Sequence, residues 1–210
     1  MANNGSPKRI DLQPLTLEGN AVRLIPIRRE HCEPLWEVVK DSTEDLFRWI
    51  PYPMRTLEDF ERWGEKALAE QARGEALVFV TVERSSGRPI GSTRFMNIDP
   101  ANRRVEIGST WIAPPWQRTA INTEAKYLML LHAFEEWGCV RVELKTDALN
   151  QKSRNAILRI GAKEEGTLRK HGVTHTGRIR DSVYFSILDT EWPEVKAGLE
   201  AKVRSRAPSK

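Results

Sequence analysis

Cysteine, histidine and long apolar runs are all scarce in this chain of 210 residues. Its two cysteines, Cys32 and Cys139, fit neither the spacing of a metal site nor that of a disulfide framework. Both lie among apolar neighbours, so we expect each to be a small buried hydrophobic residue. The four histidines also lack the spacing of metal ligands. The sequence therefore predicts no metal site.

No segment approaches the roughly 20 consecutive apolar residues that a membrane-spanning helix needs. The first nine residues are polar and lack the apolar core of a signal peptide. These absences argue against a membrane or secreted protein, and they predict a cytoplasmic one with no membrane partner.

The net charge of +4 resides mainly in the two ends of the chain. Six of the 33 basic residues lie in terminal segments without any acidic residue: Lys8, Arg9, Lys202, Arg204, Arg206 and Lys210. The other 27 basic residues face 29 acidic ones, which gives the body of the chain a charge of −2. A nucleic-acid-binding protein carries its basic surface on the folded body, so we expect no nucleic acid as a partner.

Apolar segments separated by turn residues indicate one α/β (α+β) domain of ordinary size. By their alternation, strands are expected at residues 22–27, 77–83, 89–98, 104–112, 140–146, 162–170 and 179–188. By their amphipathic spacing, helices are expected at 30–40, 56–72, 119–138 and 153–160, with a weak one after 190. The chain is thus divided into a flexible tail (1–14), a folded domain (15–190) and a terminal helix with a basic tail (191–210).

The longest predicted helix, 119–138, joins the strand at 104–112 to the strand at 140–146. A strand–helix–strand unit places its strands in parallel through a right-handed crossover. The other strands include a run joined by tight turns, which favours antiparallel pairs. The predicted sheet is therefore mixed and mostly antiparallel, with a cleft where two strands part.

The junction from Trp111 to Ala125 carries the strongest chemical signal. A strand ends there, Pro114-Pro115 stops it, and the long helix begins. The first turn of a helix has unpaired N–H groups and a positive dipole end, which together bind anions. The N–H groups of residues 118–123 are therefore candidates to hold a diphosphate, and Arg118 adds a cation. An ordinary buried strand–helix junction is the alternative interpretation.

Two spaced motifs stand out in this chain. The first combines Glu106-Ile107-Gly108, Trp116-Gln117 and Glu124-Ala125. The second consists of Asn150-Gln151-Lys152-Ser153, Ala156-Ile157, Arg159, Gly161-Ala162 and Glu165-Gly166. Together they resemble the GNAT superfamily of N-acetyltransferases, and within it the branch that acetylates the N-termini of ribosomal proteins (RimJ/RimL-like). The resemblance covers nearly all of residues 17–190, and it implies a GNAT-like seven-stranded sheet with helices on both faces.

The chain departs from the family in the phosphate loop, where glycines are usual and Arg118, Ala120 and Asn122 stand here. Glycine is needed if φ is positive or if the backbone must lie very close to phosphate. Alanine at position 120 is compatible with the negative φ of a helix's first turn, and the charge of Arg118 offers compensation.

The resemblance implies acetyl-CoA as co-substrate, in a V-shaped opening between the strands 104–112 and 140–146. Its pantetheine arm is expected to bond the open strand edge like an added strand. The residues expected to bind it are Trp111, Ile112, Gln117, Arg118, Thr119, Ala120, Ile121, Asn122, Thr123, Asn150 and Ser153.

Acetyl transfer needs one group that takes a proton from the amine and another that protonates the leaving thiolate. Glu106 is the candidate base, acting through water, because a carboxylate at the floor of the cleft can be desolvated; a surface carboxylate is the alternative. Many relatives use a tyrosine as the acid, but Tyr52, Tyr127 and Tyr184 do not lie at the start of the short helix. Ser153 is the substitute by position.

An aromatic-rich loop at 45–54 offers Trp49 and Tyr52 as walls of an amine pocket, although such a cluster also suits a core. The basic residues from Arg169 to Arg180 are expected at a solvated hairpin tip; the alternative is that they hold an acidic peptide or the 3′-phosphate of CoA. We expect direct transfer to a protein N-terminus or to a small-molecule amine, in a ternary complex. The alternative is a non-catalytic acyl-CoA-binding or scaffold protein of the same fold, and a homodimer stays open.

Overall fold

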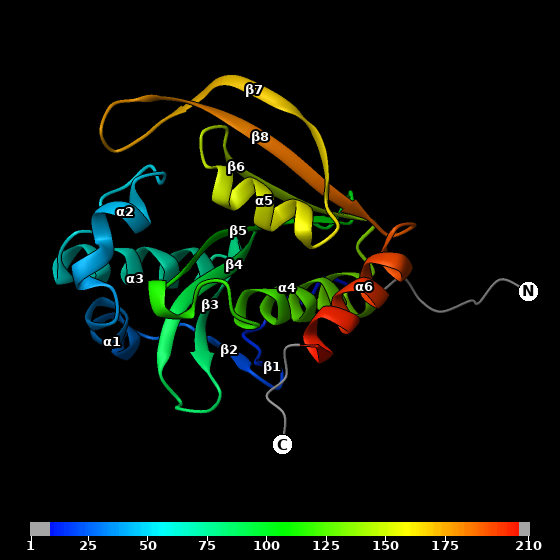
Figure 1. Ribbon diagram of the computed structural model, residues 1–210, viewed down its shortest axis with the longest axis horizontal. Helices are drawn as coiled ribbons and strands as arrows, with labels where there is room; N and C mark the ends of the chain where they lie inside the picture. Colours follow the sequence, from blue (N-terminus) through cyan, green and yellow to red (C-terminus); the bar gives the residue numbers. More distant parts are fainter. Residues whose placement is uncertain (1–8, 206–210) are drawn as a thin grey trace, which may run out of the picture.

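One eight-stranded sheet forms the centre of the computed structural model, which describes residues 9–205. Its strands lie in the order β1-β2-β3-β4-β5-β6-β8-β7 (Figure 1). Their bounds are β1 Leu17–Glu18, β2 Val22–Pro26, β3 Ala76–Glu83, β4 Pro89–Asp99, β5 Arg104–Ile112, β6 Arg141–Asp147, β7 Lys163–Val173 and β8 Ile179–Leu188. The predicted number of seven strands is too low by β1, because a two-residue strand has no alternation that a sequence could reveal.

Every pair of neighbouring strands is antiparallel except β5 and β6, which are parallel. The chain between these two strands contains the long helix α4, Ile121–Leu131. A crossover is needed there because parallel neighbours cannot be joined by a tight turn. The prediction of a mixed, mostly antiparallel sheet is confirmed.

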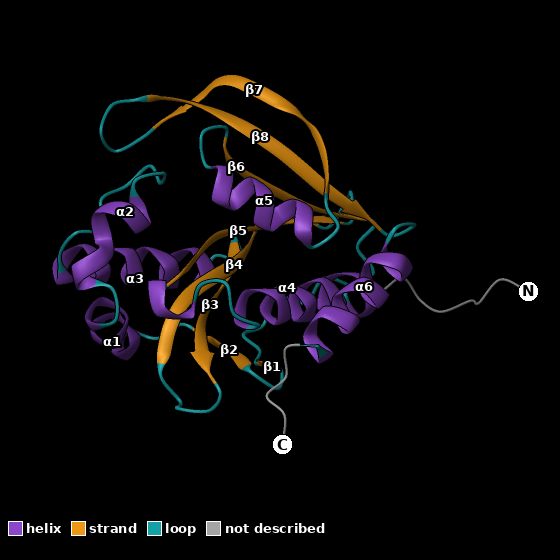
Figure 2. Cartoon of the chain, in the orientation of Figure 1, coloured by secondary structure: helices purple, strands orange, loops and turns teal. Residues whose placement is uncertain are grey.

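Helices cover both faces of the sheet, as expected (Figures 1 and 2). On one face lie α1 (Cys32–Glu37), α2 (Thr43–Phe47) and α3 (Leu57–Ala72). On the other face lie α4, α5 (Gln151–Arg159) and α6 (Trp192–Arg204). The alternation of β3 serves both layers: Leu77 and Phe79 pack toward α4, whereas Val78 and Val80 pack toward α3.

The helix predicted at 119–138 consists of two elements. Residues before Ile121 still belong to a turn, so α4 begins two residues later than predicted. A π-helical stretch, His132–Glu136, then follows α4. Within it the N–H of Trp137 donates to the carbonyl of His132, five residues back, at 3.0 Å. Gly138 follows with φ of 66°, the left-handed conformation typical of the glycine that ends a helix.

Two other predicted boundaries shift. The helix expected at 30–40 is confined to α1 and a preceding 3-10 turn, Arg29–His31. The loop expected at 45–54 begins inside α2. Ile10 packs against the core ahead of Leu15, while the tail cations Lys8, Arg206 and Lys210 lie outside the described residues.

None of the helices within residues 9–205 is long and apolar enough to cross a membrane. The cytoplasmic location stays a prediction.

Candidate active site

β5 and β6 pair only at their first residues and then part. Pairing joins Arg104–Glu106 to Arg141–Glu143, whereas β5 continues to Ile112 and β6 to Asp147. Beyond the paired residues β5 keeps β4 on its other side, and β6 keeps β8. An opening between two strand edges results, which we call the fork. It lies between the two strands where the cleft is predicted.

A β-bulge lies on the β5 edge of the fork. β5 has one residue more than β4 between two paired positions, so Ser109 and Thr110 both lie opposite Thr93. Ser109 takes a left-handed φ of 47° to allow this. Such a bulge bends the strand and re-aims its side chains, and bulges are frequent beside active sites.

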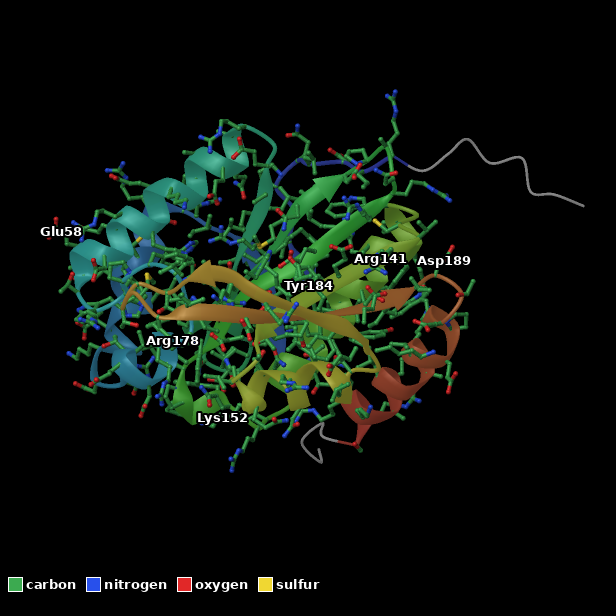
Figure 3. All side chains as sticks on the ribbon, turned by 90° about the horizontal axis from the view of Figure 1, so that it is seen from above. Glu58, Arg141, Lys152, Arg178, Tyr184 and Asp189 are labelled. Carbon is green, nitrogen blue, oxygen red and sulfur yellow. The ribbon has the colours of Figure 1, made fainter. Side chains whose placement is uncertain are left out.

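Glu106 is the last residue of β5 that pairs with β6, so it lies at the base of the fork. Its side chain is only 2% exposed, which excludes the alternative of a surface carboxylate. Its Oε2 accepts hydrogen bonds from Asn97 Nδ2 at 2.7 Å and from Lys145 Nζ at 3.1 Å. Lys145 Nζ also lies 5.7 Å from the ring centroid of Tyr184 on β8, which is labelled in Figure 3.

The first turn of α4 lies beyond the end of β5, at the open end of the fork. Within the described part of the chain, the N–H groups of Arg118, Ala120, Asn122 and Thr123 donate to no other residue. The acidic residue of this turn, Glu124, does not oppose an anion there. Its carboxylate is 2% exposed and accepts hydrogen bonds from the N–H groups at the start of β2, on the other side of the helix. The residues present therefore fit a diphosphate.

Side chains of the turn fix its shape. Gln117 Nε2 donates to the carbonyl of Ile112 at 2.9 Å, and Thr119 Oγ1 donates to the carbonyl of Trp116 at 2.7 Å. Gln117 and Thr119, both predicted to bind the coenzyme, thus hold the backbone of the turn through their side chains. The Ile112 carbonyl, expected on an open strand edge, already accepts a hydrogen bond.

The backbone angles show how residues other than glycine are accommodated in the phosphate loop. Ala120 has φ of −67°, so alanine is tolerated there, as predicted. Arg118 has φ of 63°, in the left-handed region that glycine adopts freely. The chain thus keeps the glycine-like conformation at position 118 and places an exposed guanidinium there.

The start of α5 lies beside the other arm of the fork, just after β6. Asn150 is the N-cap residue of α5, and its Oδ1 accepts a hydrogen bond from the N–H of Ser153 at 3.1 Å. Asn150 also lines a pocket beside the bulge. The structure therefore brings Asn150 close to Thr110 and Trp111 of β5, while Ser153 lies one turn further into α5.

The pocket beside the bulge has a volume of about 80 Å³. Its walls come from α2 and the loop after it, including Trp49 and Tyr52, and from the bulge. Trp111 forms another wall: its side chain is 9% exposed and lies 5.3 Å from the ring of Phe47. Trp49 and Tyr52 are half-buried and line the pocket, and Tyr52 also packs against the core, so the core alternative holds in part for Tyr52. A wider hollow of about 500 Å³ at Thr167–Lys170 lies on the outer strand β7, away from the fork.

The tip of the β7–β8 hairpin reaches the aromatic loop (Figure 1). Arg180 Nη1 donates to the carbonyl of Trp49 at 3.3 Å, and His175 Nδ1 lies 3.1 Å from the carbonyl of Ile50. Arg178, labelled in Figure 3, stacks over the Trp49 ring at 5.5 Å and forms an ion pair with buried Asp147. The prediction of a solvated hairpin tip is therefore wrong for His175, Arg178 and Arg180, which hold the pocket loop in place, whereas Arg169 and Lys170 are exposed as expected.

Several functional neighbours have no signal in the sequence. Lys145 and Asp147 read as ordinary strand residues until the register of β6 is known. Lys126 and Thr110 lie in an unremarkable helix and strand, yet they contact each other beside the pocket. Helical spacing could have placed Lys126 on the buried face of α4, among Ala125 and Met129.

The chain matches a family profile described as "Acetyltransferase (GNAT) domain" over residues 21–163. A candidate ribosomal N-acetyltransferase of Bacillus subtilis, YdaF, is 39% identical over 106 residues. That match takes in 50% of this chain and 57% of YdaF, so the chain spans little more than half the length of this relative.

Solved structures share the whole fold. A GCN5-related N-acetyltransferase from Brucella melitensis is 33% identical, with a TM-score of 0.86 over 95% of this chain and 90% of its own. A candidate acetyltransferase from T. thermophilus is 31% identical, with a TM-score of 0.81 over 90% of this chain and 97% of its own. RimJ of Mycobacterium smegmatis, in complex with CoA-disulfide, is 24% identical with a TM-score of 0.79, covering 93% and 97% of the two chains; this is a likeness of fold.

The fork, the helix terminus beside it and the match over most of the folded residues agree with one another. The chain belongs to the GNAT family of acetyltransferases.

Proposed function

We propose that this N-acetyltransferase moves the acetyl group of acetyl-CoA directly onto a primary amine while both are bound. The observation that carries the proposal is the fork, which has a buried carboxylate at its base and open helix N–H groups at its end. Holding amine and thioester together in the right orientation can remove about 7–11 kcal/mol of the barrier.

Acetyl-CoA is the acyl donor of this family, and it supplies the thioester. Within residues 118–123, the N–H groups of Arg118, Ala120, Asn122 and Thr123 would hold its diphosphate, whereas that of Ile121 donates to Thr119 Oγ1. The dipole of α4 and the charge of Arg118 would assist. Trp111, Ile112 and Asn150 border the fork or its pocket, which supports a role in holding the pantetheine arm. Ser153 is the fourth candidate, and its N–H donates to Asn150 Oδ1.

Glu106 would take the proton of the attacking amine through water. A protonated amine has no lone pair, so it cannot attack until that proton leaves. Lys145 and Asn97 hold the Glu106 carboxylate in one orientation, which supports a fixed catalytic role. General bases contribute roughly 10²–10⁴-fold to a rate.

The acceptor enters, on this proposal, through the pocket between the aromatic loop and the bulge. A volume of about 80 Å³ suits a narrow group such as the end of a peptide or a small amine. Trp49 and Tyr52 would contact it. The name of YdaF, a candidate ribosomal N-acetyltransferase, favours the N-terminus of a ribosomal protein as the first acceptor to test.

Thiol release tests the proposal. Acetyl-CoA is mixed with the protein and with a panel of amines that includes N-terminal peptides of ribosomal proteins, polyamines and amino acids. Release that depends on one class of amine supports the proposal and names the acceptor. Binding of acetyl-CoA without release in any acceptor would favour a non-catalytic acyl-CoA-binding protein instead.

A further inference from the structure

Lys126 is a buried lysine that forms no ion pair with any residue described. It lies on the sheet-facing side of α4 and is 5% exposed. Its Nζ is 2.6 Å from Thr110 Oγ1 and 3.0 Å from Thr93 Oγ1, and the two hydroxyls are 2.8 Å apart. The three polar groups form a triangle between helix and sheet.

The triangle permits two hydrogen-bond patterns, which differ in the direction of the Thr110 hydroxyl. An ammonium group only donates, so a charged Lys126 donates to both threonines. Thr93 then donates to Thr110 across the 2.8 Å contact. The hydrogen of Thr110, which has the carbonyl of Gly108 at 3.5 Å as its other acceptor within the chain, can turn outward. An uncharged amine accepts the Thr110 hydrogen instead and closes the triangle. The charge of Lys126 therefore controls where Thr110 points.

Thr110 is the member of the triangle that faces the fork. It is exposed, it belongs to the bulge, and it lines the pocket with Asn150 and Trp111. Thr93 is 1% exposed. Thr110 is therefore the member of the triangle through which a proton can move between the fork and Lys126.

We propose that Thr110 donates a proton to the coenzyme sulfur as the thioester breaks, and that Lys126 is the positioning residue that turns and reprotonates the Thr110 hydroxyl. The inference rests on the proposed function, because it names the acid of that reaction. The C–S bond breaks and its electron pair stays on sulfur. Thr110 gives its proton to sulfur and receives one from Lys126. The proton taken from the attacking amine by Glu106 and water restores the ammonium of Lys126.

The proton affinity of Lys126 suits this task. Burial lowers the pKa of Lys126 to about 7, from 10.5 for a free lysine. At neutral pH it therefore releases and regains a proton at little cost in free energy. The charged side chains on elements around α4 have other partners: Arg94 binds Glu70, Glu106 binds Lys145, Glu124 binds β2, and Lys196 and Glu200 of α6 bind Glu135 and Tyr127.

Two matched threonine variants give the first test. Thr110→Val and Thr93→Val each remove one hydroxyl from Lys126, but only Thr110 reaches the fork. We expect Thr110→Val to lower kcat for acetyl transfer about 100-fold, and Thr93→Val to lower it less than about threefold. Lys126→Met should resemble Thr110→Val, whereas Lys66→Met, which alters a lysine 69% exposed on α3, serves as the control.

The pH dependence of kcat distinguishes a positioning role of Lys126 from a loss of activity caused by a disturbed structure. The ratio of wild-type kcat to Thr110→Val kcat cancels the titration of the acceptor amine, which is common to both enzymes. We expect this ratio to fall at least tenfold between pH 6 and pH 9, because Thr110 loses its outward hydrogen when Lys126 loses its charge. A structural role would leave the ratio constant.

A binding measurement tests the roles of Thr110 and Lys126 without turnover. The dissociation constant of CoA is measured at pH 6 and at pH 9, in wild type and in Thr110→Val. At pH 6 Lys126 is charged and Thr110 can donate its hydrogen to the coenzyme sulfur, so wild type should lose about threefold more affinity than the variant between pH 6 and pH 9. This result would support the roles of Thr110 and Lys126 even if no amine in the panel were acetylated. It therefore separates this inference from the proposed function.

Equal effects of Thr110→Val and Thr93→Val on kcat would overturn the inference, and so would an equal pH dependence of CoA affinity in wild type and Thr110→Val. Ser153→Ala is the competing variant, because Ser153 is the acid suggested by position alone. A larger loss of kcat in Ser153→Ala than in Thr110→Val would move the acid to α5 and refute the role of Thr110.

Discussion

The ammonium of Lys145 lies 3.1 Å from Oε2 of Glu106, just past the last residues that join β5 to β6. The ion pair crosses the base of the fork, and it joins the two strands where their backbone pairing stops. Such a bond keeps the carboxylate aimed in one direction while the opening beside it stays accessible. This arrangement makes Glu106 testable as a base, because its surroundings are fixed.

Replacing Glu106 by Gln keeps the size of the side chain and removes its ability to take a proton. We expect kcat to fall by about 100- to 10,000-fold, because that is the typical contribution of a general base. Activity should stay above the uncatalysed reaction, since orientation of the reactants remains. Glu143→Gln is the control: Glu143 pairs with Glu106 in the sheet but binds Arg104 and Arg141. Equal losses in both variants, or none in Glu106→Gln, would contradict the assignment.

The left-handed φ at Arg118 predicts an unusual order of stability. Arg118→Ala and Arg118→Gly both remove the guanidinium, but only glycine removes the Cβ that opposes a φ of 63°. We expect the glycine variant to be more stable than the alanine variant by about 1 kcal/mol. Urea unfolding measures the difference. Both variants should bind CoA more weakly than wild type, and to the same extent, because both lack the positive charge of Arg118.

Position 19 requires glycine because it lies too close to Glu124 for a Cβ, not because of its backbone angles. A Cβ at position 19 would lie 2.5 Å from Glu124 Cδ, whose carboxylate accepts the N–H groups that start β2. We expect Gly19→Ala to lower the free energy of unfolding by about 3 kcal/mol, because a buried charged hydrogen-bond acceptor must shift. Gly198→Ala is the matched control on α6, where a Cβ meets nothing within 4 Å. It should raise stability by about 0.5–1 kcal/mol. Similar melting temperatures for the two variants would refute this account.

The lowered pKa of Lys126 predicts how the free energy of unfolding changes with pH. Its pKa is about 7 in the folded protein and 10.5 when free, so between these values the unfolded state binds more protons. The free energy of unfolding of wild type should therefore rise with pH across this window, by up to about 1.4 kcal/mol per pH unit. Below pH 7 both states hold the proton, and the contribution is flat.

Lys126→Met lacks this titration, so its advantage over wild type should be largest near pH 6 and should shrink toward pH 9. Chemical unfolding at several pH values gives both curves. Parallel curves for the two proteins would mean that Lys126 keeps an ordinary proton affinity in the folded state.

The sequence shows directly the features that depend only on residues close together in the chain. The alternation in β3, the turn at Pro114-Pro115 and the long apolar face of α4 predict strands, a break and a helix in the right places. The parallel pair follows from the helix between its strands. The N–H groups after Arg118 follow from where β5 ends, whereas the position of Glu106 at the base of the fork depends on where β5 and β6 stop pairing.

The rest depends on contacts between segments far apart in the chain. The bulge that brings Ser109 and Thr110 opposite Thr93 depends on the register of β4 and β5. The contact of Arg180 with Trp49 links residues 131 positions apart. The triangle around Lys126 requires the packing of helix on sheet. None of these produces periodicity within one segment, so no local pattern predicts them.

A crystal structure of the protein grown with acetyl-CoA tests the central claim most directly. The account predicts a diphosphate against the N–H groups of residues 118–123 and a thioester between β5 and β6, between Glu106 and Thr110. A turn before α4 that stays packed without nucleotide, at acetyl-CoA concentrations that saturate known relatives, would contradict it.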